Sequence, residues 1–308
     1  MPVKVGIISI VELSIPLLQY LQSIKIEIVL YIGSYSSDTS ISSLISFCNA
    51  SRIDYELEEN PEQLFSWFEK HQPDYCFVLG YKKRIDVGRL TAFRERLFNI
   101  HPGKLPQYRG ASPIFWQIKN GEPVLGIAIH FMNEQYDAGE IVWSREIANE
   151  AHYSSGFVEY IFSNLLVEGV HYILQSGSAT GGQLRKNVQQ DETKAVTYKK
   201  PTLPDVLINW QTMNANQIVN LTRACNPWNK GAITVYNGME VKVIDAEALD
   251  ITTDALQGVI LEMNNGIRVA CAEKTCLKIN HLNINGIYVP ARFGHQFGFT
   301  PGQYFLNS

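Results

Sequence analysis

Apolar residues in the first half of the chain follow two alternating patterns. Short, nearly unbroken runs indicate strands that are covered on both faces, and apolar residues spaced three and four apart indicate helices with one buried face. Strands are expected at residues 3–10, 26–32, 55–57, 75–79, 97–101, 125–132 and 141–147. Helices are expected at residues 13–21, 41–50, 61–71, 87–94, 112–118 and 157–174, the last one closed by Ser176-Gly177. This alternation predicts an α/β fold with a Rossmann-like, mostly parallel sheet.

The pattern changes in the second half of the chain. Residues 184–204 are rich in Gln, Lys and Pro without a sustained apolar period, which is typical of a linker. A helix is then expected at residues 216–224, followed by short strands at 232–236, 240–244, 258–262, 267–270 and 277–282. Turn pairs such as Asn237-Gly238 separate these strands and predict a smaller, open β-barrel of OB-like type. We therefore expect an N-terminal α/β domain at 1–183, a linker at 184–204 and a barrel-like domain at 205–308.

Composition narrows the class of protein. The chain has 308 residues, 45% of them hydrophobic, and a formal net charge of -4, so it has no general attraction to nucleic acid or to an anionic membrane. Its apolar runs are shorter than the ~20 residues that a membrane span needs. The start of the chain leads directly into a strand without a secretion signal, and its five cysteines contain no Cys-x-x-Cys pair. We expect a cytoplasmic protein.

Three polar residues are candidates for chemistry. Asn99 and His101 lie at the end of one predicted strand and share a face of it, and Asp137 lies in the loop after another strand. An amide can donate to a developing oxyanion, an imidazole can take a proton near neutral pH, and a carboxylate can orient that imidazole. The trio suits acyl transfer to a nitrogen. The alternative is that all three are structural, since Asn and Asp are common turn formers.

Other kinds of site have less support. The first strand is not followed by Gly-x-Gly-x-x-Gly, which argues against a nicotinamide dinucleotide, and no phosphate-binding loop of the Gly-Lys-Ser/Thr type is present. The spacing of Cys271, Cys276, His281 and His295 fits no common zinc pattern, so no metal site is expected.

Two groups of motifs resemble a known family. The signature of folate-dependent formyltransferases is similar to Asn99-Ile100-His101, Leu105-Pro106-Gln107-Tyr108-Arg109-Gly110, Pro113 and Asp137-Ala138-Gly139. The C-terminal domain of methionyl-tRNA formyltransferases and their amino-sugar relatives is similar to Asn209-Trp210, Arg223-Ala224-Cys225-Asn226-Pro227-Trp228, Gly231-Ala232 and Pro301-Gly302. The motifs follow one another in the family's order over most of the chain.

The resemblance implies transfer of a formyl group from 10-formyltetrahydrofolate, as co-substrate, to a primary amine. Asn99 would stabilise the tetrahedral oxyanion, His101 would be the proton acceptor or electrostatic partner, and Asp137 would orient His101 and manage protons. Neither a metal nor a covalent enzyme intermediate is implied.

The resemblance also implies where the two substrates lie. The expected folate contacts are Phe77, Leu79, Gly80, Tyr81, Lys82, Met132, Gln135 and Tyr136. Arg109 and Gly110 are candidates for substrate binding, although bracing of their loop is the favoured role for Arg109. The basic run at residues 82–84 is either a solvated turn or a site for the folate's glutamate tail or a substrate phosphate.

The amine acceptor is inferred from a missing feature. Methionyl-tRNA formyltransferases carry a basic, tRNA-binding insert after the second strand, whereas residues 33–43 of this chain contain no Lys or Arg. The family's Gly-Thr-Pro after the first strand is also replaced by Ser9-Ile10-Val11. We therefore expect a nucleotide-linked amino sugar as acceptor, without a nucleic acid or membrane partner. The alternatives are formylation of methionyl-tRNA and a non-catalytic folate-binding module. The C-terminal domain is compatible with nucleotide binding, with a homodimer and with merely covering the active-site side.

Overall fold

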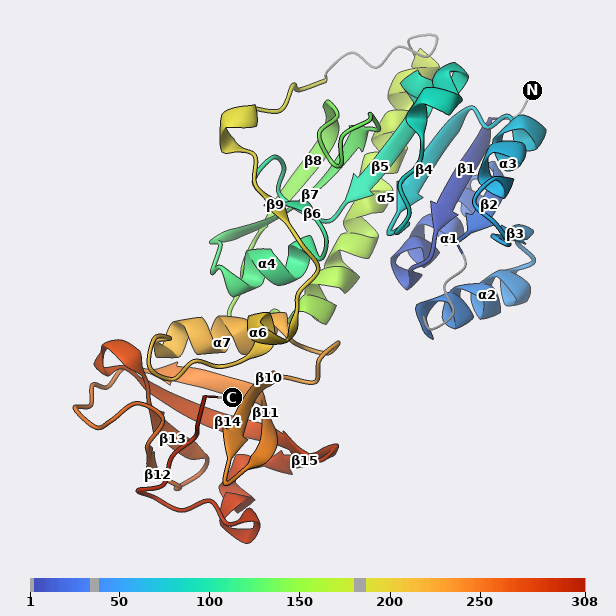
Figure 1. The fold of residues 1–308 in the computed structure, drawn as a ribbon. Helices are drawn as coiled ribbons and strands as arrows, with labels where there is room; N and C mark the ends of the chain where they lie inside the picture. The colour runs from blue at the N-terminus through green and yellow to red at the C-terminus, as the bar shows by residue number, and fades with distance from the viewer. Residues whose placement is uncertain (1–2, 34–38, 180–186, 308) are drawn as a thin grey trace. The chain divides into compact units, whose positions relative to one another are not determined.

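The computed structural model describes residues 3–33, 39–179 and 187–307 (Figure 1). By tertiary contacts the chain divides into two compact units, residues 1–113, 126–147 and 159–198 in the first, and 114–125, 148–158 and 199–308 in the second. Among the described residues, no helix is long and apolar enough to cross a membrane.

The first unit is built on a mostly parallel sheet, as predicted. Within the described residues the strand order is β3-β2-β1-β4-β5-β7-β8, and Figure 1 shows β3 to β5 of this order from right to left. The strands from β3 to β5 pair in parallel, and β7 pairs antiparallel with β5. The strands are β1 Lys4–Ser9, β2 Glu27–Ile32, β3 Tyr55–Leu57, β4 Tyr75–Leu79, β5 Leu97–His101, β7 Val124–Phe131 and β8 Ile141–Ala148.

Helices connect these strands. They are α1 Ile15–Ser23, α2 Thr39–Ser51, α3 Gln63–His71 and α5 Ser155–Ala179. Helix α4 Pro113–Lys119 precedes β7 in the chain and belongs, apart from Pro113, to the second unit. Short 3₁₀ helices are η1 Glu12–Ser14 and η2 Val87–Arg96, and η2 replaces the helix expected at 87–94 because Leu90 has non-helical dihedral angles. The expected end of α5 at Ser176-Gly177 is wrong. A Cβ at Gly177 would lie 2.0 Å from the Tyr75 hydroxyl, so this glycine permits close packing against β4 instead of ending the helix.

The second unit is an antiparallel half-barrel, in agreement with the expected small β-domain. Its strands are β10 Ala232–Tyr236, β11 Met239–Leu249, β12 Ile260–Glu262, β13 Ile267–Ala270, β14 Cys276–Ile284 and β15 Ile287–Pro290. They follow the order β10-β11-β14-β13-β12, with β15 added on β14. The helices are α6 Leu203–Val206, α7 Ala215–Ala224, η4 Ala272–Lys274 and η5 Ala291–Phe297. Tyr236, Phe299 and Phe305 form its buried aromatic core with Trp210.

The segment expected to be a linker has tertiary structure of its own where it is described. Val188 makes an antiparallel bridge to Ile141. Further along are η3 Glu192–Lys194 and β9 Thr197–Tyr198, and β9 pairs in parallel with β6 Arg109–Gly110. Residues 187–198 therefore pack within the first unit. Their polar composition hid this from the sequence pattern because the pairing uses backbone groups and buried polar side chains.

Candidate active site

Asn99, His101 and His130 lie on one face of the first unit's sheet. Asn99 and His101 are two residues apart on β5, so their side chains point the same way. His130 on β7 is directly opposite Asn99 in the antiparallel register, which places the side chains of cross-strand partners on one face. Both imidazoles are buried, with 4% and 2% of their surface exposed.

The carboxylate of Asp137 holds this group together. Its Oδ1 accepts a hydrogen bond from Asn99 Nδ2 at 2.9 Å and lies 3.5 Å from both His101 Nδ1 and His130 Nε2. Its Oδ2 accepts from the backbone N–H of Gly110 at 2.8 Å. The structure thus brings the two ends of the sequence motif, 99–110 and 137–139, to one carboxylate.

Backbone contacts assign the proton on each imidazole. His130 Nδ1 lies 2.8 Å from the carbonyl oxygen of Phe131, so Nδ1 carries the proton and Nε2 accepts from Asn99 Nδ2 at 3.1 Å. His101 Nε2 donates to the carbonyl oxygen of Tyr108 at 2.6 Å. When His101 is neutral its Nδ1 therefore presents a lone pair toward Asp137, and a proton arriving there would form an ion pair.

Burial and neighbouring charges shift the pKa values of His101 and Asp137. Burial lowers the pKa of His101 below its ordinary value, although the Asp137 charge and the Tyr108 carbonyl act in the opposite direction. Burial alone would raise the pKa of Asp137, but His101, His130 and the Gly110 N–H outweigh burial and hold it well below its usual range. Near neutral pH the site therefore holds an ionised Asp137 and a neutral His101.

The loop that carries Asp137 leaves β7 at the end of the sheet away from His101 and has to turn back to reach the site. Because β7 runs antiparallel to β5, the loop begins beside Leu97, whose carbonyl accepts from the Met132 N–H at 2.9 Å. The chain then returns to the level of Asn99 and leaves beside Phe131, whose N–H donates to the Glu140 carbonyl. A Cβ at Gly139 would lie 1.8 Å from the Phe131 carbonyl oxygen, so only glycine permits this return path.

Arg109 and Gly110 have distinct positions. The Arg109 side chain is buried and bonds to Gln190 and Glu192, with its guanidinium facing both carboxylate oxygens of Glu192. Gly110 has a positive φ of 91°, and a Cβ there would lie 2.2 Å from the Tyr198 carbonyl oxygen. The Arg109 side chain is thus held by residues 190 and 192, and the choice between bracing and substrate binding stays a prediction.

The residues predicted to contact folate lie in three kinds of environment. Phe77 and Leu79 are buried on β4, and Phe77 stacks on Phe98 at 5.2 Å. Gly80, Tyr81 and Lys82 follow that strand, and the Tyr81 hydroxyl bonds to Glu58. Met132 packs partly buried against the core, whereas Gln135 and Tyr136 are exposed in the Asp137 loop. Arg84 links the two loops by donating to the Glu134 carbonyl at 2.7 Å.

Sequence reasoning missed two residues of this cluster. His130 had a detectable signal, since it is the one polar side chain in the apolar run from Ile127 to Phe131. Gln190 had none, because it lies in a polar segment without periodicity. It is nevertheless buried, with 4% of its surface exposed.

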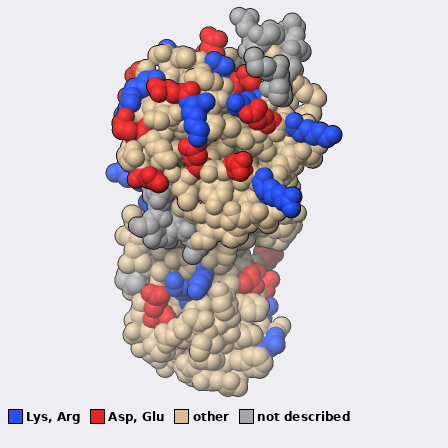
Figure 2. Space-filling model, turned by 90° about the vertical axis from the view of Figure 1, so that its right-hand side faces the viewer, with Lys and Arg blue, Asp and Glu red and all other residues tan. Residues whose placement is uncertain are grey.

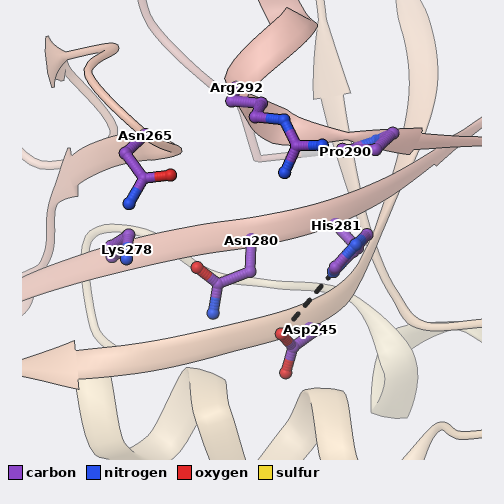
Figure 3. Close-up of a pocket in the computed structure, with 7 residues that line it drawn as sticks. All are labelled: Asp245, Asn265, Lys278, Asn280, His281, Pro290 and Arg292. Carbon is purple, nitrogen blue, oxygen red and sulfur yellow. Dashed lines mark ion pairs between the residues drawn. The ribbon is translucent and has the colours of Figure 1, made fainter.

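A cavity in the half-barrel contains none of these residues (Figure 3). Its volume is about 270 Å³, and it is lined by Asp245, Asn265, Lys278, Asn280, His281, Pro290 and Arg292. Lys278 is paired with Glu247 at 2.8 Å, and His281 faces Asp245 at 3.7 Å. The described residues group no three or more His, Cys, Asp or Glu side chains to hold a metal ion, here or in the first unit.

This two-part architecture, an α/β unit with an Asn–His–Asp cluster followed by an antiparallel half-barrel, corresponds to one family. Residues 38–164 match the formyl transferase model, and residues 202–288 match the model of the formyl transferase C-terminal domain. A methionyl-tRNA formyltransferase from Caldanaerobacter subterraneus is 31% identical over 219 residues, covering 70% of this chain and 68% of the relative. The chain belongs to the formyl transferase family.

Coverage of the curated relatives is incomplete. The chain spans 64% of the length of a methionyl-tRNA formyltransferase from Clostridium novyi, with 28% identity over 204 residues. Among solved structures, the sugar 3N-formyl transferase WlaRD, described in the presence of dTDP and 5-N-formyl-THF, has a TM-score of 0.71 and 17% identity, with 91% of this chain and 97% of WlaRD covered. At that identity the likeness is one of fold.

Proposed function

We propose that this protein transfers a formyl group from 10-formyltetrahydrofolate to a primary amine. The observation that carries the proposal is the convergence of Asn99 and His101 on one oxygen of Asp137. This group of side chains lies within residues that match the formyl transferase model.

The proposed reaction is a direct acyl transfer. The lone pair of the neutral amine attacks the formyl carbon, a carbon–nitrogen bond forms, and the formyl oxygen becomes an oxyanion. The bond from the formyl carbon to N10 of the folate then breaks. The amine nitrogen loses one proton and N10 gains one, so atoms and charge balance without an oxidant or a reductant.

Each side chain has a defined task in this scheme. Both amide hydrogens of Asn99 are engaged, with Asp137 and with His130, so Asn99 must release one of them to donate to the oxyanion. His101 accepts the proton of the amine at Nδ1, and Asp137 stabilises the resulting imidazolium.

For the acceptor we propose the amino group of a nucleotide-linked sugar. Residues 33–43 contain no Lys or Arg, and on the described surface in Figure 2 basic and acidic side chains are interspersed without a broad field of one sign. Such a surface gives little of the phosphate neutralisation that nucleic-acid binding requires. The fold of a sugar formyltransferase supports the same acceptor. The names of the sequence relatives favour methionyl-tRNA as the second candidate.

The test is an acceptor panel. The full chain is incubated with 10-formyltetrahydrofolate and either nucleotide-linked amino sugars or initiator methionyl-tRNA, and release of tetrahydrofolate is measured. We expect turnover with at least one amino sugar, and a loss of roughly 10²–10⁴-fold in Asp137→Asn. Turnover with the tRNA alone would overturn the acceptor. Folate binding without turnover on any acceptor would favour the non-catalytic module.

A further inference from the structure

Gln190 connects the two halves of the candidate site. Its Oε1 accepts from Arg109 Nε at 3.1 Å and from Arg109 Nη2 at 2.8 Å. Its Nε2 donates to the carbonyl oxygens of Asp137 at 2.8 Å and of Gly139 at 2.7 Å. A carboxamide offers two acceptor sites and two donor hydrogens, so the hydrogen-bonding capacity of Gln190 is saturated here.

The backbone that Gln190 holds is strained. Asp137 has a φ of 53°, in the left-handed region that residues with a Cβ rarely adopt. Such a conformation persists only where the surroundings fix it. The two hydrogen bonds from Gln190 Nε2, to the carbonyl oxygens of Asp137 and Gly139, fix the backbone of this turn.

Residues 196–198, in the same segment as Gln190, also fix the Gly110 backbone that bonds to the Asp137 carboxylate. The Arg109 N–H donates to the Val196 carbonyl at 3.0 Å, and the Ala111 N–H donates to the Tyr198 carbonyl at 3.0 Å. These bonds flank Gly110, whose N–H points to Asp137 Oδ2. Glu192 adds an ion pair to Arg109 at 2.6 Å, with 7% of the Arg109 side chain exposed and 60% of the Glu192 side chain.

We propose that residues 187–198 form a positioning strap, in which Gln190 sets the place of the Asp137 carboxylate relative to Asn99 and His101. Gln190 is a positioning residue and acts through Asp137. Sequence composition had assigned this segment to a linker, and neither family model extends over it.

Gln190→Met tests the strap, because it keeps the length of the side chain and removes all four hydrogen bonds. Gln189→Met is the matched control, since Gln189 is the exposed neighbour in the same segment. The kinetic arm rests on the proposed function. We expect kcat of Gln190→Met to fall on the order of 10²-fold, because a misplaced catalytic group loses about that much, while KM for the folate changes less than about 3-fold.

A second measurement needs no enzymatic turnover, so it tests the positioning strap independently of the proposed function. Imidazole resonances of His101 and His130 are titrated by NMR in the folded proteins. We expect the His101 titration to move to lower pH in Gln190→Met, because the Asp137 charge that raises its pKa is displaced, and to be unchanged in Gln189→Met. If the wild-type protein transfers no formyl group, this arm still decides the proposal.

Two results would overturn it: wild-type kcat in Gln190→Met, or an unchanged His101 titration in that variant. Should Gln190→Met fail to fold, Glu192→Gln replaces it, because the exposed Glu192 braces Arg109 from outside. For Glu192→Gln we expect kcat to fall by less than about 10²-fold and the His101 titration to move to lower pH; both results support the strap. A folded Glu192→Gln protein with wild-type kcat and a wild-type His101 titration refutes it.

Discussion

His101 is buried and the Asp137 side chain is 12% exposed, and the pKa values of both differ from those of free side chains. Both pKa values lie below their ordinary values, and both groups sit inside the first unit. A group with a depressed pKa binds its proton more readily in the unfolded chain, so it contributes stability above its ordinary pKa and loses that contribution as the pH falls. We therefore expect the site to make the fold sensitive to acid.

We expect the free energy of unfolding to fall as the pH drops from 7 to 5. In this window the unfolded His101, with an ordinary pKa of about 6.5, takes up a proton that the folded one resists. The slope for one proton is at most about 1.4 kcal/mol per pH unit. Urea unfolding at each pH measures it. His101→Gln should flatten the dependence, whereas the exposed His281→Gln should not; equal slopes in all three proteins would contradict this assignment.

Two pairs of backbone segments in the site lie in direct contact, because a glycine leaves no side chain between them. Gly110 lets β6 lie against β9, and Gly139 lets the Asp137 loop return beside Phe131. These two glycines belong to the Arg-Gly and Asp-Ala-Gly motifs. Their presence in the sequence is explained by packing, and the chemistry depends on that packing.

Gly139→Ala should therefore damage activity and stability together. The new Cβ meets the Phe131 carbonyl oxygen at 1.8 Å, and such overpacking typically costs about 1–3 kcal/mol. Thermal unfolding and formyl transfer measure the two effects. Gly286→Ala is the control, because its φ of 85° adds strain but no atom lies within 4 Å. A Gly139→Ala protein with wild-type turnover would show that the loop has another path.

At the scale of the whole molecule, charge bears on the acceptor. The net charge is -4, and basic and acidic side chains are mixed on the face that Figure 2 shows, so neither gives a general attraction for a polyanion. Binding of nucleic acid through several phosphates weakens by orders of magnitude between 50 and 200 mM salt.

We expect kcat/KM for a nucleotide-linked amino sugar to change less than about tenfold over that range, since few phosphates are neutralised. Steady-state kinetics at several salt concentrations, with the folate saturating, provide the measurement. A steep salt dependence with the preferred acceptor would instead indicate a nucleic-acid substrate.

Local pattern was sufficient for much of this protein. The predicted bounds of β3, β4, β5, β10 and β13 agree with the structure. In β4 the reason is burial, because a strand covered on both faces has a nearly unbroken apolar run. The same logic placed Asn99 and His101 on one face, since alternate residues of a strand point the same way. The family and its fold class followed from motifs in the right order.

Only the tertiary structure decided how those pieces meet. The direction of β7 relative to β5, which puts His130 beside Asn99, depends on long-range backbone pairing that leaves no mark in the hydrophobic period. Gln190 lies about fifty residues from Asp137, as its bond to the Asp137 carbonyl records. Its polar segment has no apolar face, so the sequence alone indicated a linker where the structure has a segment that pairs with β6 and bonds to the Asp137 loop.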